Sequence, residues 1–111
     1  MSIKWGQVNF EGPYRLDSWK PPYRAGIYAI MMKPDPQNKP NTYKILYFGE
    51  SENMSERGFY KNHHKYNCWL REAGSLRNLF IGYYLMPDST LFQRKSLEQQ
   101  LIDQYKPKCN E

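Results

Sequence analysis

Two tyrosines, each close to a glycine, are the side chains of this sequence best placed to do chemistry together. Tyr28 follows Gly26 at the start of one run of β-branched and aromatic residues, and Tyr47 precedes Gly49 at the end of another. Such runs are typical of strands, and the proline-rich residues 33–42 between them predict a loop. Two strands joined in this way are most simply an antiparallel hairpin. We therefore expect the two phenols to lie together beside glycines that allow a backbone or a phosphate to approach closely.

A carboxylate, Glu98, falls within the apolar face of a predicted helix over residues 91–105. Thr90 and Gln93 fit a capping box at the start of this helix, and Pro107 ends it. The apolar face comprises Leu97, Leu101, Ile102 and Tyr105. Because a buried unpaired charge is costly, Glu98 requires a partner. A salt bridge to Arg94, one turn earlier, is one alternative, and a divalent cation with oxygen ligands is the other.

The hairpin motifs resemble those of the GIY-YIG nuclease family. Gly26-Ile27-Tyr28 matches the first motif, and Tyr47-Phe48-Gly49 matches the second with Phe in place of Ile. The rest of the family pattern follows in order: an arginine on the next helix, a glutamate on a later helix and an asparagine near the end. The residues that fill these places are Arg57, Glu98 and Asn110. The resemblance covers roughly residues 24–110.

The resemblance implies a nuclease that hydrolyses phosphodiester bonds in DNA with one divalent ion, Mg²⁺ or Mn²⁺. It assigns the metal to Glu98 and the scissile phosphate to Arg57, whose guanidinium is a planar fork of donors that keeps its charge. Without the family pattern, Arg57 would be a surface arginine paired with a nearby carboxylate. Tyr28, with Tyr47 or a histidine, would accept the proton of the attacking water. Since a phenol with its ordinary pKa is a poor base near neutrality, the pKa of Tyr28 would have to be lowered by the metal or by Arg57.

The residue that assists this base is left open. Many family members carry a histidine or tyrosine shortly after the arginine, and here Tyr60, His63 and His64 are all candidates; a histidine titrates nearest neutral pH. The resemblance also implies that Asn110 fixes the site through hydrogen bonds, with Gly26 in support. The expected substrate-binding residues are Gly49, Ser51, Tyr60, Lys61 and Lys65. A zinc site of His64, Cys68 and Cys109 is a further alternative, although it lacks a paired ligand motif.

The composition favours a polyanionic partner. Sixteen Lys and Arg residues against eleven Asp and Glu give a net charge of +5, and aromatic residues make up 16% of the chain. Rings that stack on bases, together with cations that meet phosphates, suit nucleic acid, and the family resemblance makes DNA the expected partner. Two rival functions are a DNA- or RNA-binding module that does not cut and a subunit whose N-terminal arm docks a larger protein. Oligomeric state is left open.

The sequence predicts an intracellular, cytoplasmic protein with two free thiols and no membrane partner. A secretory signal would require an apolar run shortly after Met1, and the sequence has none there. No stretch of the sequence approaches the length of a membrane span. The only cysteines are Cys68 and Cys109, and intracellular thiols are ordinarily reduced.

The expected fold is α/β (α+β), with an antiparallel three-stranded sheet flanked by about three helices. The predicted strands are 27–31, 43–48 and 77–86, the last of them central. Three helices are predicted. The first begins at Ser51 or Asn53, the second runs from about His63 to Gly74, and the third spans residues 91–105. Residues 1–23, which are dense in prolines and aromatics, are expected to form an irregular arm packed on a catalytic domain of residues 24–111.

Overall fold

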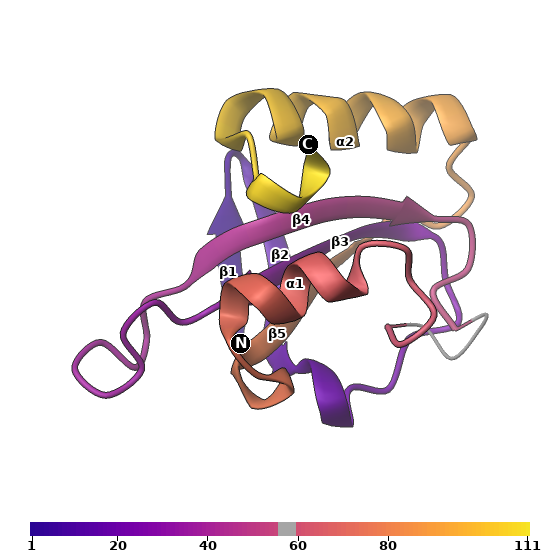
Figure 1. Ribbon diagram of the computed structural model, residues 1–111. Helices are drawn as coiled ribbons and strands as arrows, with labels where there is room; N and C mark the ends of the chain where they lie inside the picture. Colours follow the sequence, from indigo (N-terminus) through magenta and orange to yellow (C-terminus); the bar gives the residue numbers. More distant parts are fainter. Residues whose placement is uncertain (56–59) are drawn as a thin grey trace.

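The computed structural model describes residues 1–55 and 60–111, and their centre is a five-stranded antiparallel sheet in the order β1-β2-β5-β3-β4 (Figure 1). The strands are β1 (Ser2–Trp5), β2 (Val8–Arg15), β3 (Gly26–Met32), β4 (Lys44–Ser51) and β5 (Leu79–Leu85). Within the described residues the α-helices are α1 (Tyr66–Ala73) and α2 (Leu91–Tyr105). Three short 3-10 helices are η1 (Leu16–Ser18), η2 (Leu76–Asn78) and η3 (Lys108–Asn110).

The prediction of a three-stranded sheet flanked by about three helices is wrong, although the class is α+β. The sheet has five strands because residues 2–15, expected as part of an irregular arm, form β1 and β2, and β2 pairs with β5. Proline does not prevent this, since Pro13 lies where the β2–β5 register shifts between Glu11 and Tyr14, a place that tolerates a missing N–H. Residues 52–55, where the first helix was expected to begin, form turns instead.

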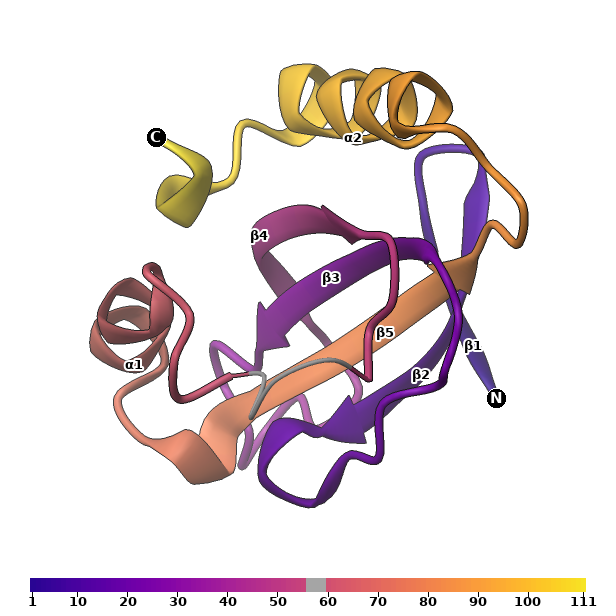
Figure 2. The ribbon, with the colours of Figure 1, turned by 90° about the vertical axis from the view of Figure 1, so that its right-hand side faces the viewer.

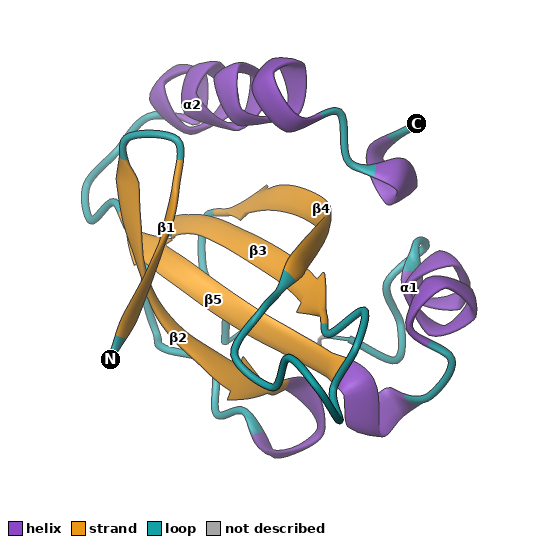
Figure 3. Cartoon of the chain, turned by 90° about the vertical axis from the view of Figure 1, so that its left-hand side faces the viewer, coloured by secondary structure: helices purple, strands orange, loops and turns teal. Residues whose placement is uncertain are grey.

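The predicted hairpin is confirmed, and its two faces separate the helices. On β3, Ile27, Ala29 and Met31 pack in one buried cluster with Leu101 of α2, whereas Tyr28 and Ile30 pack in another with Trp69 of α1. Successive strand residues point to opposite faces, so α2 and α1 cover opposite faces of the sheet (Figure 2). Strand β4 is one of the two edge strands of the sheet and runs between the two helices (Figure 3).

The helix boundaries follow from their caps. The predicted capping box is present at α2, where the Thr90 hydroxyl accepts from the Gln93 N–H and the Gln93 side chain accepts from the Thr90 N–H. Helix α1 ends at Gly74, whose φ of 85° suits a glycine.

The prediction that the third strand is central is also confirmed, because β5 lies between β2 and β3. None of the helices in the described ranges combines the length and the apolar character needed to cross a membrane.

The two cysteines form a disulfide, so the prediction of free thiols is wrong. Cys68 of α1 is bonded to Cys109 of η3, at a sequence separation of 41. The bond also removes both thiols from the zinc set considered with His64. Cysteine separation alone could not reveal the pair, because the fold of the intervening residues brings α1 and η3 together.

Candidate active site

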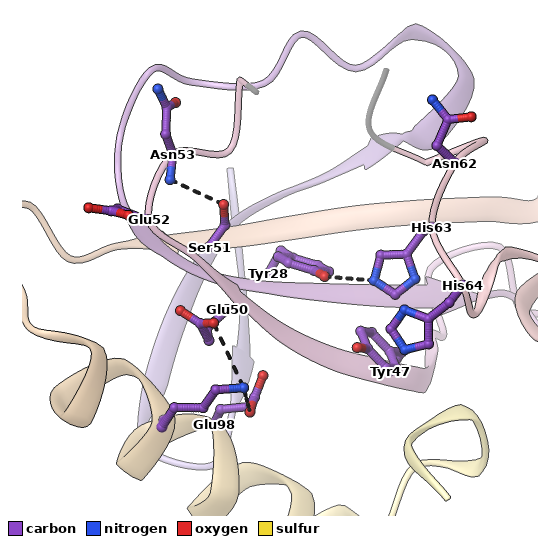
Figure 4. Close-up of a pocket in the computed structure, with 11 residues that line it drawn as sticks. Tyr28, Tyr47, Glu50, Ser51, Glu52, Asn53, Asn62, His63, His64 and Glu98 are labelled. Carbon is purple, nitrogen blue, oxygen red and sulfur yellow. Dashed lines mark hydrogen bonds and ion pairs between the residues drawn. The ribbon is translucent and has the colours of Figure 1, made fainter. Parts of the chain in front are cut away.

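A pocket of about 480 Å³ lies at the end of β4, where residues from both layers meet around the edge of the sheet (Figure 4). Its walls come from the hairpin, the turn after β4, the loop before α1 and helix α2. Five of the residues expected at a catalytic site line it: Tyr28, Tyr47, His63, His64 and Glu98. The other lining residues are Glu50, Ser51, Glu52, Asn53, Asn62 and Lys95, of which Ser51 was expected to bind substrate.

The two motif tyrosines lie together because the hairpin register places them so. Their ring centroids are 6.1 Å apart, and Tyr28 lies directly opposite Gly49 on β4. A Cβ atom on Gly49 would overlap the Tyr28 ring, so glycine at this position creates the space the phenol occupies. Gly26 lies opposite Ser51 at the other end of the motif, where a Cβ would overlap the backbone oxygen of Tyr84.

His63 is the histidine that contacts the motif tyrosines. Its Nε2 lies 3.0 Å from the Tyr28 hydroxyl oxygen, and its Nδ1 accepts a hydrogen bond of 3.0 Å from the Lys65 backbone N–H. A neutral imidazole whose Nδ1 accepts carries its proton on Nε2, so His63 donates to Tyr28. His64 stacks on His63 at a centroid distance of 4.6 Å. Tyr60, the third candidate, does not line the pocket and packs against Tyr66.

The surroundings of both tyrosines favour the protonated phenols. Burial raises the pKa of Tyr28 well above its ordinary value, and the charges of Tyr47, Glu98 and Glu50 act in the same direction. Burial and the charge of Glu98 also raise the pKa of Tyr47, although the hydrogen bond with Tyr28 partly opposes this. Deprotonation of Tyr28 therefore requires positive charge nearby, as the sequence analysis anticipated.

Glu98 is shielded from solvent and faces the pocket. Its side chain is 13% exposed, and its Oε1 lies 3.5 Å from the Lys95 ammonium. Burial raises the pKa of Glu98; Lys95 opposes this rise, and the neighbouring Glu50 charge reinforces it. The salt bridge to Arg94, proposed as one alternative, is absent, because the Arg94 guanidinium points to a different carboxylate.

That carboxylate is Glu50, which sequence reasoning missed as a site residue. Arg94 Nε donates to Glu50 Oε1 at 2.9 Å, with the side chains 5% and 15% exposed. Arg94 also donates to the backbone oxygen and hydroxyl of Ser89, at 2.8 and 3.0 Å. The position of Glu50 directly after the motif glycine Gly49 could have marked it as a site residue. Its partner, Arg94, lies 44 residues away on α2, so the ion pair could not be inferred from neighbouring residues. The Lys95 ammonium lies 3.8 Å from the second Glu50 oxygen, so Lys95 stands between the two carboxylates.

Replacing Glu98 by glutamine should stabilise the metal-free protein near neutral pH. The folded-state pKa of Glu98 is raised above its unfolded value, so the folded protein holds this proton more tightly than the unfolded chain. The resulting destabilisation is fully present above the raised pKa and disappears below the unfolded value of about 4.3. Because Lys95 offsets part of the cost of burying this charge, we expect a gain below about 1 kcal/mol. Urea denaturation of both proteins in EDTA at pH 7 and pH 4 measures it; a less stable Glu98→Gln at pH 7 would contradict it.

Asn110 holds the edge strand beside the pocket. Its Oδ1 accepts from the Phe48 N–H and its Nδ2 donates to the Phe48 carbonyl, both at 2.9 Å. Phe48 lies between Tyr47 and Gly49, so this pair of hydrogen bonds occupies the open edge of β4 inside the second motif. The expected role of Asn110 in fixing the site thus has a physical basis in this contact.

Asn110→Ala should lower the free energy of unfolding by about 1–3 kcal/mol, because it leaves a part-buried N–H and carbonyl of Phe48 without their partner. Urea denaturation measures the loss. Asn67→Ala is the matched control: Asn67 is exposed on α1, and its replacement should change stability by less than about 0.5 kcal/mol. Equal effects of the two substitutions would contradict the prediction.

The two lysines predicted to bind substrate lie away from the pocket. Arg57, expected to hold the phosphate, is outside the described residues. Lys65 donates from its ammonium to the backbone oxygen of Glu111 at 2.9 Å, and the Lys61 ammonium lies over the Tyr60 ring at 5.9 Å. Neither lysine lines the pocket, so the structure does not bring them to the expected substrate site.

The donor set of the pocket fits a hard divalent cation held by a single carboxylate. Glu98 presents carboxylate oxygens to a polar cavity, and Glu50 adds a second negative charge within reach of the same lysine. Among the described residues there is no cluster of three or more His, Cys, Asp or Glu side chains suited to a metal. Mg²⁺ is frequently bound by one or two carboxylates, with water and substrate phosphate as its other ligands. Glu98 is therefore the residue that would hold the ion.

The residues of this pocket come from four separate segments of the chain and combine two phenols, two imidazoles and two shielded carboxylates. That combination can accept a proton, donate to a developing charge and hold a cation. No family model, curated protein or solved structure matches this chain.

Proposed function

We propose that this protein is a metal-dependent endonuclease that hydrolyses phosphodiester bonds in DNA, in the manner of the GIY-YIG family that its motifs resemble. The observation that supports the proposal most is the convergence of Tyr28, Tyr47, His63 and Glu98 on one polar pocket. The sequence separates these residues by up to 70 positions, and the pocket unites the phenols with the carboxylate only because α2 packs along β4. The net charge of +5 favours a polyanionic substrate.

In the proposed reaction a water molecule attacks the phosphorus, and the bond to the leaving 3′ oxygen breaks. The Tyr28 oxygen, as phenolate, accepts the proton of the attacking water, and the Nε2–H of His63 stabilises that phenolate by donating to it. The charge of Arg57 would hold the phosphate. A divalent cation held by Glu98 would supply positive charge to the phosphate and the leaving oxygen, and would offset the carboxylate charge that raises the pKa of Tyr28.

Nicking of supercoiled plasmid tests this proposal. Wild-type protein with Mg²⁺ or Mn²⁺ should cut, EDTA should stop the cutting, and Glu98→Gln should cut at least about 100-fold more slowly. Asp103→Asn is the matched control, because Asp103 is an exposed carboxylate on the same helix, and this variant should cut at the wild-type rate. Cutting by Glu98→Gln at the wild-type rate would exclude Glu98 as the metal ligand.

A second function, nucleic-acid binding without cutting, is favoured by two observations on the same pocket. The Lys95 ammonium forms an ion pair with the Glu98 carboxylate at 3.5 Å, and it also lies 3.8 Å from a Glu50 oxygen, so a cation of the chain itself is placed beside both carboxylates. Such a module would bind DNA and would not cut it, whichever divalent metal ion is added. The affinity of the protein for DNA would be the same in Glu98→Gln as in the wild type. Fluorescence anisotropy with labelled DNA, run beside the nicking assay, separates the two functions.

A further inference from the structure

A second pocket, of about 440 Å³, opens on the same face of the sheet as the candidate active site. It is lined by Pro13, Tyr14, Arg15, Ser18, Trp19, Lys20 and Tyr83. Its walls come from β2, the segment around η1 and strand β5. Most of it therefore belongs to the N-terminal residues, outside the part of the chain that carries the nuclease-like motifs.

The register of the sheet connects the two pockets. Tyr83 on β5 lies directly opposite Tyr28 on β3, and residues opposite each other across an antiparallel pair share a face, about 5 Å apart at Cα. Tyr83, Tyr14 and Trp19 also pack against the same buried cluster as Tyr28. The second pocket thus begins one strand away from the proposed catalytic tyrosine, on the same surface.

Its aromatic rings are fixed relative to one another. The Tyr14 and Tyr83 rings stack with centroids 6.1 Å apart and planes 24° apart, and the Trp19 ring lies 5.9 Å from that of Tyr83. Both phenols donate to one carboxylate oxygen of Glu11. Glu11 thereby holds two rings in place from outside the pocket, and the three rings remain partly exposed. A fixed, partly exposed set of rings is a platform on which another flat ring can stack.

Two cations border this platform. Arg15 and Lys20 are exposed beside the pocket, and Asp17 orients Arg15 through a 2.5 Å ion pair. Aromatic rings beside cations are the combination that binds single-stranded nucleic acid, where bases stack on the rings and phosphates meet the charges. Bases inside a duplex are already stacked on both sides and cannot use such a platform. The occupant that fits is therefore an unpaired base with its phosphate.

We infer that the pocket formed by Tyr14, Trp19 and Tyr83 binds one unpaired base of the nucleic acid that reaches the candidate active site, with the adjoining phosphate at Arg15 and Lys20. The inference rests on the proposed function in that the substrate is a nucleic acid. It adds a substrate class: DNA with a single-stranded segment next to the cleavage position, such as an overhang or a branch, in preference to a continuous duplex.

Binding in EDTA tests the inference without any cleavage. Fluorescence anisotropy compares a blunt duplex, the same duplex with an oligo-dT overhang, and that overhang with its bases removed but its phosphates kept. The wild-type protein should prefer the overhang with bases to both other probes. Trp19→Ala should lower the affinity for this overhang by between about fivefold and about a hundredfold, with the blunt duplex bound as before. Trp19→Phe, which keeps a ring, should recover part of the loss, and Phe92→Ala, which removes an 80% exposed ring on α2, should change nothing.

Equal binding of the base-containing and base-free overhangs by the wild-type protein would overturn the inference, and this comparison requires no variant to fold. An overhang preference that survives in folded Trp19→Ala would also overturn it. The outcome is distinct from that of the nicking assay. Metal-dependent nicking without an overhang preference would support the proposed nuclease and exclude the base-binding subsite. An overhang preference without nicking would support the subsite on a protein that binds nucleic acid without cutting it.

Discussion

Tyr28→Phe should cut DNA about 10²- to 10⁴-fold more slowly than the wild-type protein, the range typical of losing a general base. The substitution removes only the hydroxyl, so the ring that fills the space at Gly49 remains. The hydroxyl is also the group that contacts His63. Initial rates of plasmid nicking measure the effect, with circular dichroism confirming the fold.

The pH dependence of nicking provides a second measure of the same role. Because the pKa of Tyr28 is raised, the fraction of phenolate is small near neutrality and grows as the pH increases. The wild-type rate should therefore rise through the alkaline range, and Tyr28→Phe should lose this rise. Tyr43→Phe is the matched control, since Tyr43 packs edge-on against Phe80 at the other end of the hairpin. A Tyr28→Phe rate within about threefold of the wild type would exclude Tyr28 as the base.

Arg94→Leu should lower the free energy of unfolding by about 3–5 kcal/mol, the usual cost of removing one partner from a buried ion pair. The substitution leaves the Glu50 carboxylate, 15% exposed, without the guanidinium that neutralises it, and leaves the Ser89 carbonyl without its charged donor. The Lys95 ammonium, 3.8 Å from the other Glu50 oxygen and 56% exposed, offsets this charge only in part because it is solvated. Urea denaturation measures the loss.

A double-mutant cycle separates the pair from its two members. Glu50→Leu combined with Arg94→Leu should be more stable than Arg94→Leu alone, because the second change removes the uncompensated charge. Arg77→Leu, which alters an exposed arginine in η2, should change stability by less than about 0.5 kcal/mol. If the single variant Arg94→Leu were as stable as the wild type, the Glu50–Arg94 contact would not stabilise the fold.

Local patterns predicted much of the fold and of the candidate site. The hairpin followed from two β-rich runs around a proline-rich loop, and α2 followed from its apolar face, its capping box and Pro107. The burial of Glu98 followed from its position on that face. Each of these signals lies within a short window of sequence, where residue type directly determines strand, turn or helix.

The features that sequence reasoning missed depend on contacts between distant segments. Strand β2 pairs with β5, and β1 pairs with β2. The prolines of the N-terminal segment, such as Pro13, favoured an irregular arm and gave no sign of this pairing. A salt bridge between Arg94 and Glu98 was one of two alternatives because both lie on one helix, whereas in the fold Arg94 pairs with Glu50 of β4. The disulfide between Cys68 and Cys109 likewise joins residues whose proximity is set by the folded chain.

The disulfide also makes part of the backbone a closed loop. Cys68 and Cys109 enclose β5 and α2, including Arg94 and Glu98, in a covalent ring that leaves Tyr28, Tyr47 and His63 outside it. A single protease cut anywhere between the two cysteines opens this ring without releasing a fragment. The carboxylate expected to bind metal thus stays attached to the part of the chain that carries the tyrosines, even when the exposed turn between β5 and α2 is severed.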